Sequence, residues 1–129
     1  MSSSKTENLN LHAWTPDDPV KMSEFNENFA ILDRAARIVT GSYVGNGAYG
    51  ESSPTTLTLD FAPKFLMIWQ VNGANTAVSL SGFSLRITNY NTNWGCTTTW
   101  DGTTVSWYNA TSADRQMNAN AYYTYLAVG

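Results

Sequence analysis

The sequence predicts a mainly β protein in which one N-terminal α-helix precedes an antiparallel β-sandwich or barrel. Apolar residues recur at heptad spacing between residues 21 and 39. Short alternating segments separated by turn signals fill residues 41–129. Charged residues make up only 13% of the 129, so the Glu and Lys that favour exposed helices are scarce. We therefore expect an extended arm plus an oligomerising helix over 1–40 and a β-sandwich head over 41–129.

Residues 21–39 form the only segment with a clear helical pattern. Ser23 is the expected N-cap, because its hydroxyl can accept a hydrogen bond from an early backbone N–H. Glu24 and Glu27 follow in the first turns, where the positive end of the helix dipole favours acidic side chains. Gly41 is the expected stop. The preceding residues 1–20 are polar and contain two prolines, which predicts an extended arm.

The predicted helix carries an apolar stripe with successive spacings of 3, 4, 3, 4 and 3 residues. The stripe consists of Met22, Phe25, Phe29, Leu32, Ala36 and Val39. A helix of about 18 residues spans roughly 27 Å and is marginally stable alone in water, so this stripe has to be buried. It can pack on the sheet of its own chain, or against copies of itself at the axis of an oligomer. Its place ahead of an all-β region favours the oligomer, and Trp14 is a candidate to fix the arm to a neighbouring chain.

Seven strands are expected in the β region. They cover residues 55–61, 65–71, 76–80, 84–90, 94–100, 103–108 and 121–128. Segment 65–71 (FLMIWQV) is almost continuously apolar, which is typical of a strand covered on both faces. The polar segment 109–120 is interpreted as a loop.

Asp101-Gly102 predicts a two-residue type I′ turn and pairs Trp100 with Thr103. Because side chains alternate along a strand, this register assigns one face of the hairpin to the core. The predicted core residues of the hairpin are Trp94, Cys96, Thr98, Trp100, Val105 and Trp107. Trp69 is also assigned to the core.

Charge and composition exclude several kinds of function. A net charge of −3 with only seven basic residues provides no electrostatic footprint for nucleic acid or an anionic membrane. No apolar run approaches the ~20 residues that span a bilayer, and the polar N-terminus contains no Sec signal. A single Cys cannot form a zinc cluster. The only histidine, His12, lies before the expected folded region, so we expect no multi-histidine metal site and no histidine-based triad within the chain. We therefore expect no metal, no cofactor and no enzymatic activity.

Four sequence stretches resemble phage and prophage tail-fibre or tail-appendage proteins of Gram-positive hosts. The first is WTPDDPVKMSEFNENFAILDRA, with its Trp, Asp-Pro step, Phe-Asn pair and Leu-Asp ending. GSYVGNG and LTLDFAPKFLMI resemble the opening glycine motif and a strand pair of the family's β domain. MNANAYYTYLAVG resembles its closing strand. These stretches follow one another in the expected order between residues 14 and 129, and residues 72–93 match nothing in the pattern.

The resemblance implies a homotrimer with a coiled-coil-like helical stem and a C-terminal β domain that contacts the host. Such a protein is made in the bacterial cytoplasm, joins other tail or baseplate proteins in the virion, and binds a receptor, which we expect to be a cell-wall glycan. Sugars offer hydroxyl groups to polar side chains and C–H faces to aromatic rings. The candidate ligand-binding residues are Tyr49, Tyr90, Asn91, Asn93, Tyr108, Asn109 and Arg115.

Two other functions remain open. The chain can be a purely structural tail module whose receptor is recognised by another protein. It can also be a wall polysaccharide hydrolase, which normally requires two carboxylates across a cleft. Only Glu51 and Asp114 remain as loop carboxylates without a structural explanation, and no motif surrounds either residue. The hydrolase is therefore the weaker alternative.

Overall fold

The protein, as a computed structural model that describes residues 1–35 and 37–129, divides into two compact units. They are Met1–Ala36 and Arg37–Gly129. The first unit contains one helix and a small two-stranded sheet, and the second contains an eight-stranded sheet. The protein is thus mainly β.

The first unit folds its N-terminal arm back onto its own helix. Strands β1 (Ser4–Lys5) and β2 (His12–Ala13) form an antiparallel pair beside helix α1 (Met22–Arg34). The Trp14 ring stacks on Phe25 of this helix with ring centroids 5.2 Å apart. Trp14 therefore fixes the arm to its own chain in this structure, where we had expected a neighbouring chain.

Helix α1 begins before the expected N-cap. Lys21 is the N-cap residue, and no side chain caps the helix there. The backbone N–H groups of Glu24 and Phe25 donate to the Lys21 carbonyl at 3.1 and 3.2 Å. Ser23 therefore lies inside the helix, and its prediction as the N-cap is wrong.

The helix also ends earlier than predicted, at Arg34, because the next segment joins the sheet. β-Branched residues favour strands, and strand β3 (Ile38–Val44) pairs with the last strand of the chain. Val39, predicted as part of the helical stripe, lies in β3 and packs against the core of the sheet. Gly41 lies in the same strand, where a Cβ atom would overlap the Tyr125 ring. Ala36 of the stripe lies outside the described residues.

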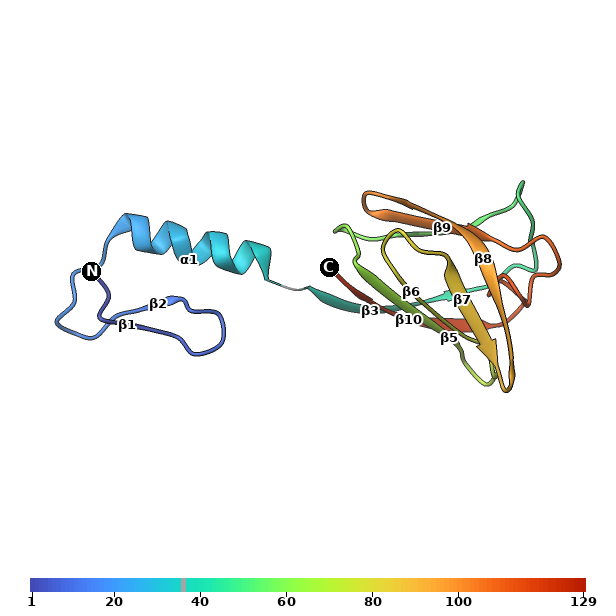
Figure 1. The fold of residues 1–129 in the computed structure, drawn as a ribbon, viewed down its shortest axis with the longest axis horizontal. Helices are drawn as coiled ribbons and strands as arrows, with labels where there is room; N and C mark the ends of the chain where they lie inside the picture. The colour runs from blue at the N-terminus through green and yellow to red at the C-terminus, as the bar shows by residue number, and fades with distance from the viewer. Residues whose placement is uncertain (36) are drawn as a thin grey trace. The chain divides into compact units, whose positions relative to one another are not determined.

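The second unit is one sheet in which every neighbouring pair of strands is antiparallel (Figure 1). The strand order is β3-β10-β5-β6-β7-β8-β9-β4. The strands after β3 are β4 (Thr55–Thr58), β5 (Phe65–Gln70), β6 (Thr76–Leu80), β7 (Leu85–Asn89), β8 (Thr92–Asp101), β9 (Thr104–Tyr108) and β10 (Tyr122–Val128).

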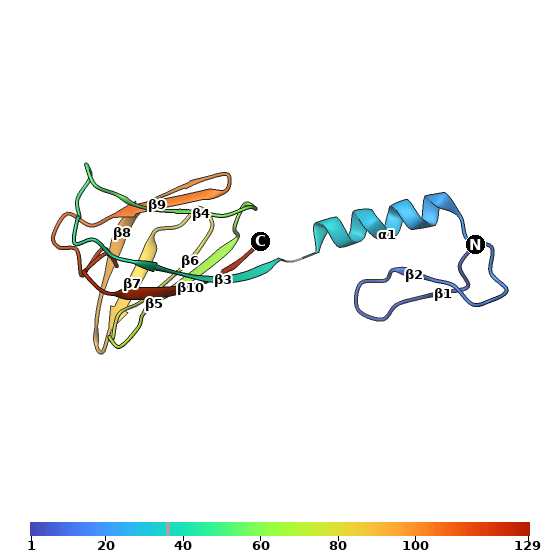
Figure 2. The ribbon, with the colours of Figure 1, turned by 180° about the vertical axis from the view of Figure 1, so that it is seen from behind.

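The sheet curls, so that strands far apart in its order share one core (Figure 2). The rings of Tyr43 in β3 and Trp107 in β9 meet edge to face with centroids 6.5 Å apart. Leu66, Ile68 and Val105 are fully buried in this core. All eight strands belong to a single curled sheet, so the expected sandwich of two sheets is not confirmed.

The β8–β9 hairpin forms where the sequence predicts it, but in a different register. Trp100 pairs with Val105, and Gly102-Thr103 form the two-residue loop, with φ of +57° at Gly102. The predicted pairing of Trp100 with Thr103 is therefore wrong by two residues. A shift of two leaves each side chain on the same face, so Cys96 and Trp107 are buried as predicted. By contrast, Trp69 is only partly buried. Side chains alternate along β5, so Trp69 lies on the other face of the strand from the buried Leu66 and Ile68.

Residues 109–121 form no strand, as expected of a loop, but their middle is buried. Gln116 is fully buried, and its Oε1 accepts from the backbone N–H groups of Gly50 and Asn109, both at 2.9 Å. Its Nε2 donates to the carbonyl of Ser53 at 2.9 Å. The Trp107 indole N–H donates to the Gln116 carbonyl at 2.8 Å. This loop therefore completes the core at one end of the sheet.

Replacing Gln116 by Leu keeps the side chain's approximate size but leaves the Gly50 and Asn109 N–H groups without their acceptor. We expect the free energy of unfolding to fall by about 2–4 kcal/mol, measured by urea denaturation. Asn120→Leu is the matched control, since Asn120 is exposed in the same loop, and its effect should stay within about 0.5 kcal/mol. Equal losses in both variants would contradict this role of Gln116.

Candidate functional site

The antiparallel topology brings four loops to one end of the curled sheet. In an antiparallel sheet successive connections alternate between the two ends. One end carries the β3–β4, β5–β6, β7–β8 and β9–β10 connections, residues 45–54, 71–75, 90–91 and 109–121. We call it the loop end. The chain enters this unit at Arg37 and ends at Gly129, and both lie at the opposite end, where the C-terminus is marked in Figure 1. The Gly129 N–H donates a hydrogen bond to the Arg37 carbonyl at 2.7 Å.

Polar side chains connect the loops of the loop end. Gln116 joins the β9–β10 loop to the β3–β4 loop through Gly50. The Asn89 amide, at the end of β7, donates to Asn75 Oδ1 at 2.6 Å. Asn75 in turn donates to the Asp114 carbonyl at 3.1 Å. These bonds link the β3–β4, β5–β6 and β9–β10 loops to one another and to the last residue of β7.

Each predicted ligand-binding residue lies in a loop of the loop end or near a strand terminus that leads into it. Two groups result: one on the β7–β8 hairpin, and one around the β9–β10 loop and the Tyr49 loop. The first group is Tyr90, Asn91 and Asn93, and the second is Tyr49, Tyr108, Asn109 and Arg115. Tyr90 is 88% exposed and Tyr49 is 47% exposed. Asn91 and Arg115 are also exposed.

Three of these residues also serve the fold. Asn93 Oδ1 accepts a hydrogen bond from Arg86 at 2.8 Å. Asn109 Oδ1 accepts from the Thr111 N–H at 2.8 Å. Tyr108 is half-buried in β9. Their side chains are therefore less available to a ligand than those of Tyr49, Tyr90, Asn91 and Arg115.

Arg115 is held in place by the residues beneath it. Its guanidinium carbon lies 5.3 Å from the centre of the Trp94 ring. The Trp94 indole N–H and the Cys96 thiol both donate to the Arg115 carbonyl, at 2.8 and 3.3 Å. Burial raises the pKa of Cys96 to about 12, so the thiol stays protonated and can donate. The result is an exposed cation on a fixed aromatic support.

Tyr122 was not identified from the sequence. It is the first residue of β10 and is 67% exposed, whereas the next residue, Tyr123, is fully buried. The alternation within AYYTYLAV was the available signal, because only one of two adjacent tyrosines can face the core. With Tyr49 and Tyr90, the loop end therefore carries three exposed tyrosines.

The apolar stripe of α1 is a second candidate surface. Met22 is 75%, Phe29 61% and Leu32 48% exposed, so these side chains lack cover. Phe25 is 41% exposed and lies between Trp14 and Phe29, with ring centroids 5.2 and 6.0 Å away. The arm thus covers part of Phe25 and leaves Met22, Phe29 and Leu32 in contact with water.

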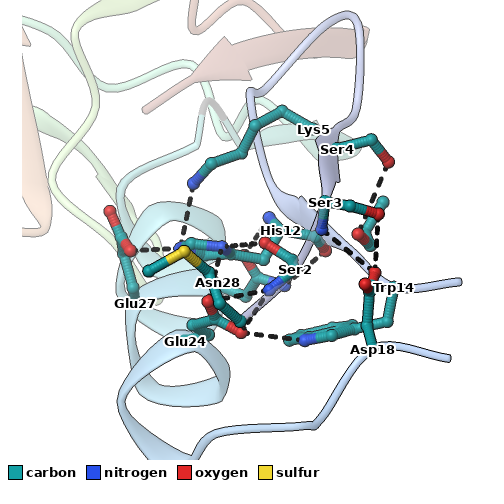
Figure 3. Close-up of polar contacts among 12 residues, drawn as sticks. Ser2, Ser3, Ser4, Lys5, His12, Trp14, Asp18, Glu24, Glu27 and Asn28 are labelled. Carbon is teal, nitrogen blue, oxygen red and sulfur yellow. Dashed lines mark hydrogen bonds and ion pairs between the residues drawn. The ribbon is translucent and has the colours of Figure 1, made fainter.

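A cluster of charged and polar side chains holds the arm on α1 (Figure 3). Glu24, only 6% exposed, accepts hydrogen bonds from the Ser2 N–H at 2.9 Å and from the Trp14 indole at 2.8 Å. Burial opposes the ionisation of Glu24, but these hydrogen bonds outweigh it and lower its pKa. The His12 ring contacts Glu27, which lowers the pKa of that carboxyl, and the nearby Lys5 adds to this effect.

Asp18 closes the other side of the same cluster. Its carboxylate accepts from the Thr15 N–H at 2.8 Å and from the Ser3 N–H at 3.0 Å. These contacts, led by Thr15, lower the pKa of Asp18 to about 2. A cavity of about 240 Å³ lies beside Ser2, His12 and Glu24, whose polar groups already bond to one another. We therefore assign the cluster to holding the arm.

Acid should loosen the arm. Asp18, Glu24 and Glu27 have lowered pKa values in the folded protein, so their stabilising contribution is complete above their unfolded values of about 4. It is lost as the pH falls through the folded values, down to about 2 for Asp18. Lys5, the N-terminal amine and the His12 ring are the groups facing these carboxylates.

We expect the Trp14 indole N–H resonance to shift towards its solvent-exposed position between pH 5 and pH 2, measured by ¹⁵N NMR and assigned with Trp14→Phe. The Trp107 indole, buried and bonded to Gln116, is the internal control and should not move. A Trp14 resonance that stays constant over this range would contradict the assigned role of the carboxylates.

Comparison with known proteins gives no match to a family model, to a curated protein or to a solved structure. Within residues 1–35 and 37–129, no helix is long and apolar enough to cross a membrane.

Proposed function

We propose that this chain is the receptor-binding protein of a phage or prophage tail fibre, which attaches to a cell-wall glycan of its bacterial host through the loop end. The observation that carries the proposal is that three exposed tyrosines, Tyr49, Tyr90 and Tyr122, lie in the loop end, at the end of the sheet opposite Arg37, where the chain enters. The sequence resemblance to tail appendages supplies the biological setting. The protein would act in the virion tail, beside other tail or baseplate proteins.

Tyr90 is the strongest single argument for binding at this end. It has φ of +53° in a two-residue hairpin loop, a conformation that glycine adopts without strain and that costs a tyrosine energy. Its ring is 88% exposed and adds little to the core. Folding therefore explains neither the residue type nor its position, whereas contact with a ligand explains both.

The chemistry of the loop end suits a neutral or weakly acidic sugar. Exposed tyrosine rings can stack on the C–H face of a pyranose, and Asn91 beside Tyr90 can exchange hydrogen bonds with its hydroxyl groups. Arg115, supported on Trp94, can donate to a carboxylate or phosphate substituent. The connected loops hold these groups in place before binding, which lowers the entropic cost of association.

The proposal includes a homotrimer with α1 as a coiled-coil-like stem. The exposure of Met22, Phe29 and Leu32 in the single chain supports it, because association would remove these side chains from water. The trimeric state comes from the resemblance. We also retain the sandwich-like head in the proposal, since the Tyr43–Trp107 contact brings the two halves of the sheet together.

Tyr90→Gly separates binding from folding. We expect this variant to unfold at the same or a slightly higher urea concentration, since glycine tolerates the positive φ. Binding to purified cell walls of Gram-positive bacteria, measured by co-sedimentation over a panel of species, should fall at least tenfold. Tyr49→Ala and Tyr122→Ala should weaken it in the same assay.

Phe83→Ala is the matched control, because Phe83 is 67% exposed in the β6–β7 connection at the opposite end of the sheet. It should bind cell walls like the unmodified chain. Unchanged binding in all three tyrosine variants would contradict recognition by the loop end. If no wall in the panel binds the unmodified chain, the structural tail module becomes the better account. Release of soluble wall fragments would instead favour the hydrolase.

The stem is tested by adding charge to the stripe. Phe29→Glu with Leu32→Glu should convert an assembly of three times 14.2 kDa into monomers, measured by sedimentation equilibrium, because burying four or more carboxylates together is costly. Phe25 is avoided because it also holds Trp14.

Ser23→Glu with Ala30→Glu is the control for this experiment. Both residues are exposed on α1 away from the stripe, and the variant carries the same added charge. It should remain assembled. A wild-type chain that stays monomeric at high concentration would contradict the stem.

A further inference from the structure

Four neighbouring strands expose an apolar surface on the side of the sheet away from the core. We call it the outer face; it consists of the residues of β3, β10, β5 and β6 that point away from the buried set in the half of the sheet nearer Arg37 and Gly129. They are Ile38, Thr40, Leu126, Val128, Phe65, Met67, Val78 and Leu80. None of these side chains within the four described strands is charged.

The strand register makes this surface continuous. One row runs Ile38–Val128–Phe65–Leu80, four apolar side chains directly opposite one another across the four strands. The next row runs Thr40–Leu126–Met67–Val78. Half-buried rings and methyl groups thus form a patch two rows deep, with Trp69 in the row above.

Part of this patch is open to water. Ile38 is 70%, Leu80 58% and Val78 41% exposed. An antiparallel sheet with one wet face normally alternates apolar with polar residues, and β5 instead reads FLMIWQ. That composition is typical of a strand covered on both faces, but in the single chain only one face of β5 packs into the core.

We propose that the outer face packs against a second copy of this chain, so that the β units associate with one another as well as the helices. This inference rests on the proposed self-association. Two rows of side chains about 7 Å apart on four strands about 4.8 Å apart cover roughly 300 Å². A standard interface takes about 800 Å² from each partner. The outer face is too small to hold an independent protein firmly, but it suits a contact between chains that another interface already holds together.

Two features favour another copy as the partner. The outer face is uncharged, so identical faces can approach without like-charge repulsion. Leu32 and Ile38 are six residue steps apart in the chain, a separation of at most about 20 Å. Association of α1 would therefore bring copies of the outer face to a high effective concentration, at which a small apolar contact is sufficient.

Val78→Lys with Leu80→Lys tests the inference in the full-length chain. Both positions are exposed, so the fold should survive, as checked by the urea midpoint. We expect the concentration at which the assembly half-dissociates, measured by sedimentation, to rise at least tenfold. Thr97→Lys with Thr99→Lys, exposed on the outward side of β8, is the control with the same charge and should change it less than twofold.

The outcomes separate this inference from the stem. If the stripe variant dissociates and the β6 variant behaves like its β8 control, the outer-face contact is wrong and the stem stands. If the β6 variant dissociates and the stripe variant does not, the outer face holds the assembly and the stem is wrong. A monomeric wild-type chain overturns both. Leu80→Cys gives a second readout: it should form disulfide-linked dimers on mild oxidation, and Thr99→Cys should not.

Discussion

The hydrogen bonds of Gln116 are the contact on which the β unit depends most. A curled sheet of eight strands leaves its interior open where the strands end, and here the β9–β10 loop fills that opening. Gln116 can lie there because Gly50, Asn109, Ser53 and Thr55 together satisfy its amide completely. The same bonds fix the backbone that carries Tyr49 and Arg115, so the packing of the core and the shape of the loop end have a common origin.

Two apolar surfaces remain uncovered in the single chain, one on α1 and one on the outer face of the sheet. An isolated helix of 13 residues with this exposed stripe gains little from its own hydrogen bonds, and its stability has to come from packing. The arm supplies some of that packing through Trp14 and Glu24. The remainder is the physical reason to expect association of several chains, and association would carry several loop ends on one particle, which strengthens weak binding to repetitive surfaces.

Local patterns in the sequence predicted most of the strands, because alternation and turn residues act over a few positions. The β6 segment was predicted with its observed bounds, and burial of Cys96 and Trp107 survived an error of two residues in the hairpin register. Long-range contacts were less predictable. Val39 continued a helical spacing, yet pairing with Ala127 placed it in a strand. Gln116 looked like an ordinary loop residue, because two of its partners, Gly50 and Ser53, lie more than 60 residues away in the β3–β4 connection.

For the candidate site, too, local features were more predictable than long-range placement. The position of Tyr49 in a loop was predicted from the glycines around it, whereas Tyr90 was predicted as the last residue of a strand and lies in a hairpin loop. The location of both residues at one end of the sheet required the full strand order. The central claim is that copies of α1 associate along the exposed stripe. Distances between spin labels at Ser23→Cys in the assembled chain test it most directly, since native Cys96 is buried and escapes labelling. The account predicts distances between chains of roughly two to three helix diameters, about 20–35 Å. The absence of measurable dipolar coupling between spin labels on different chains would contradict it.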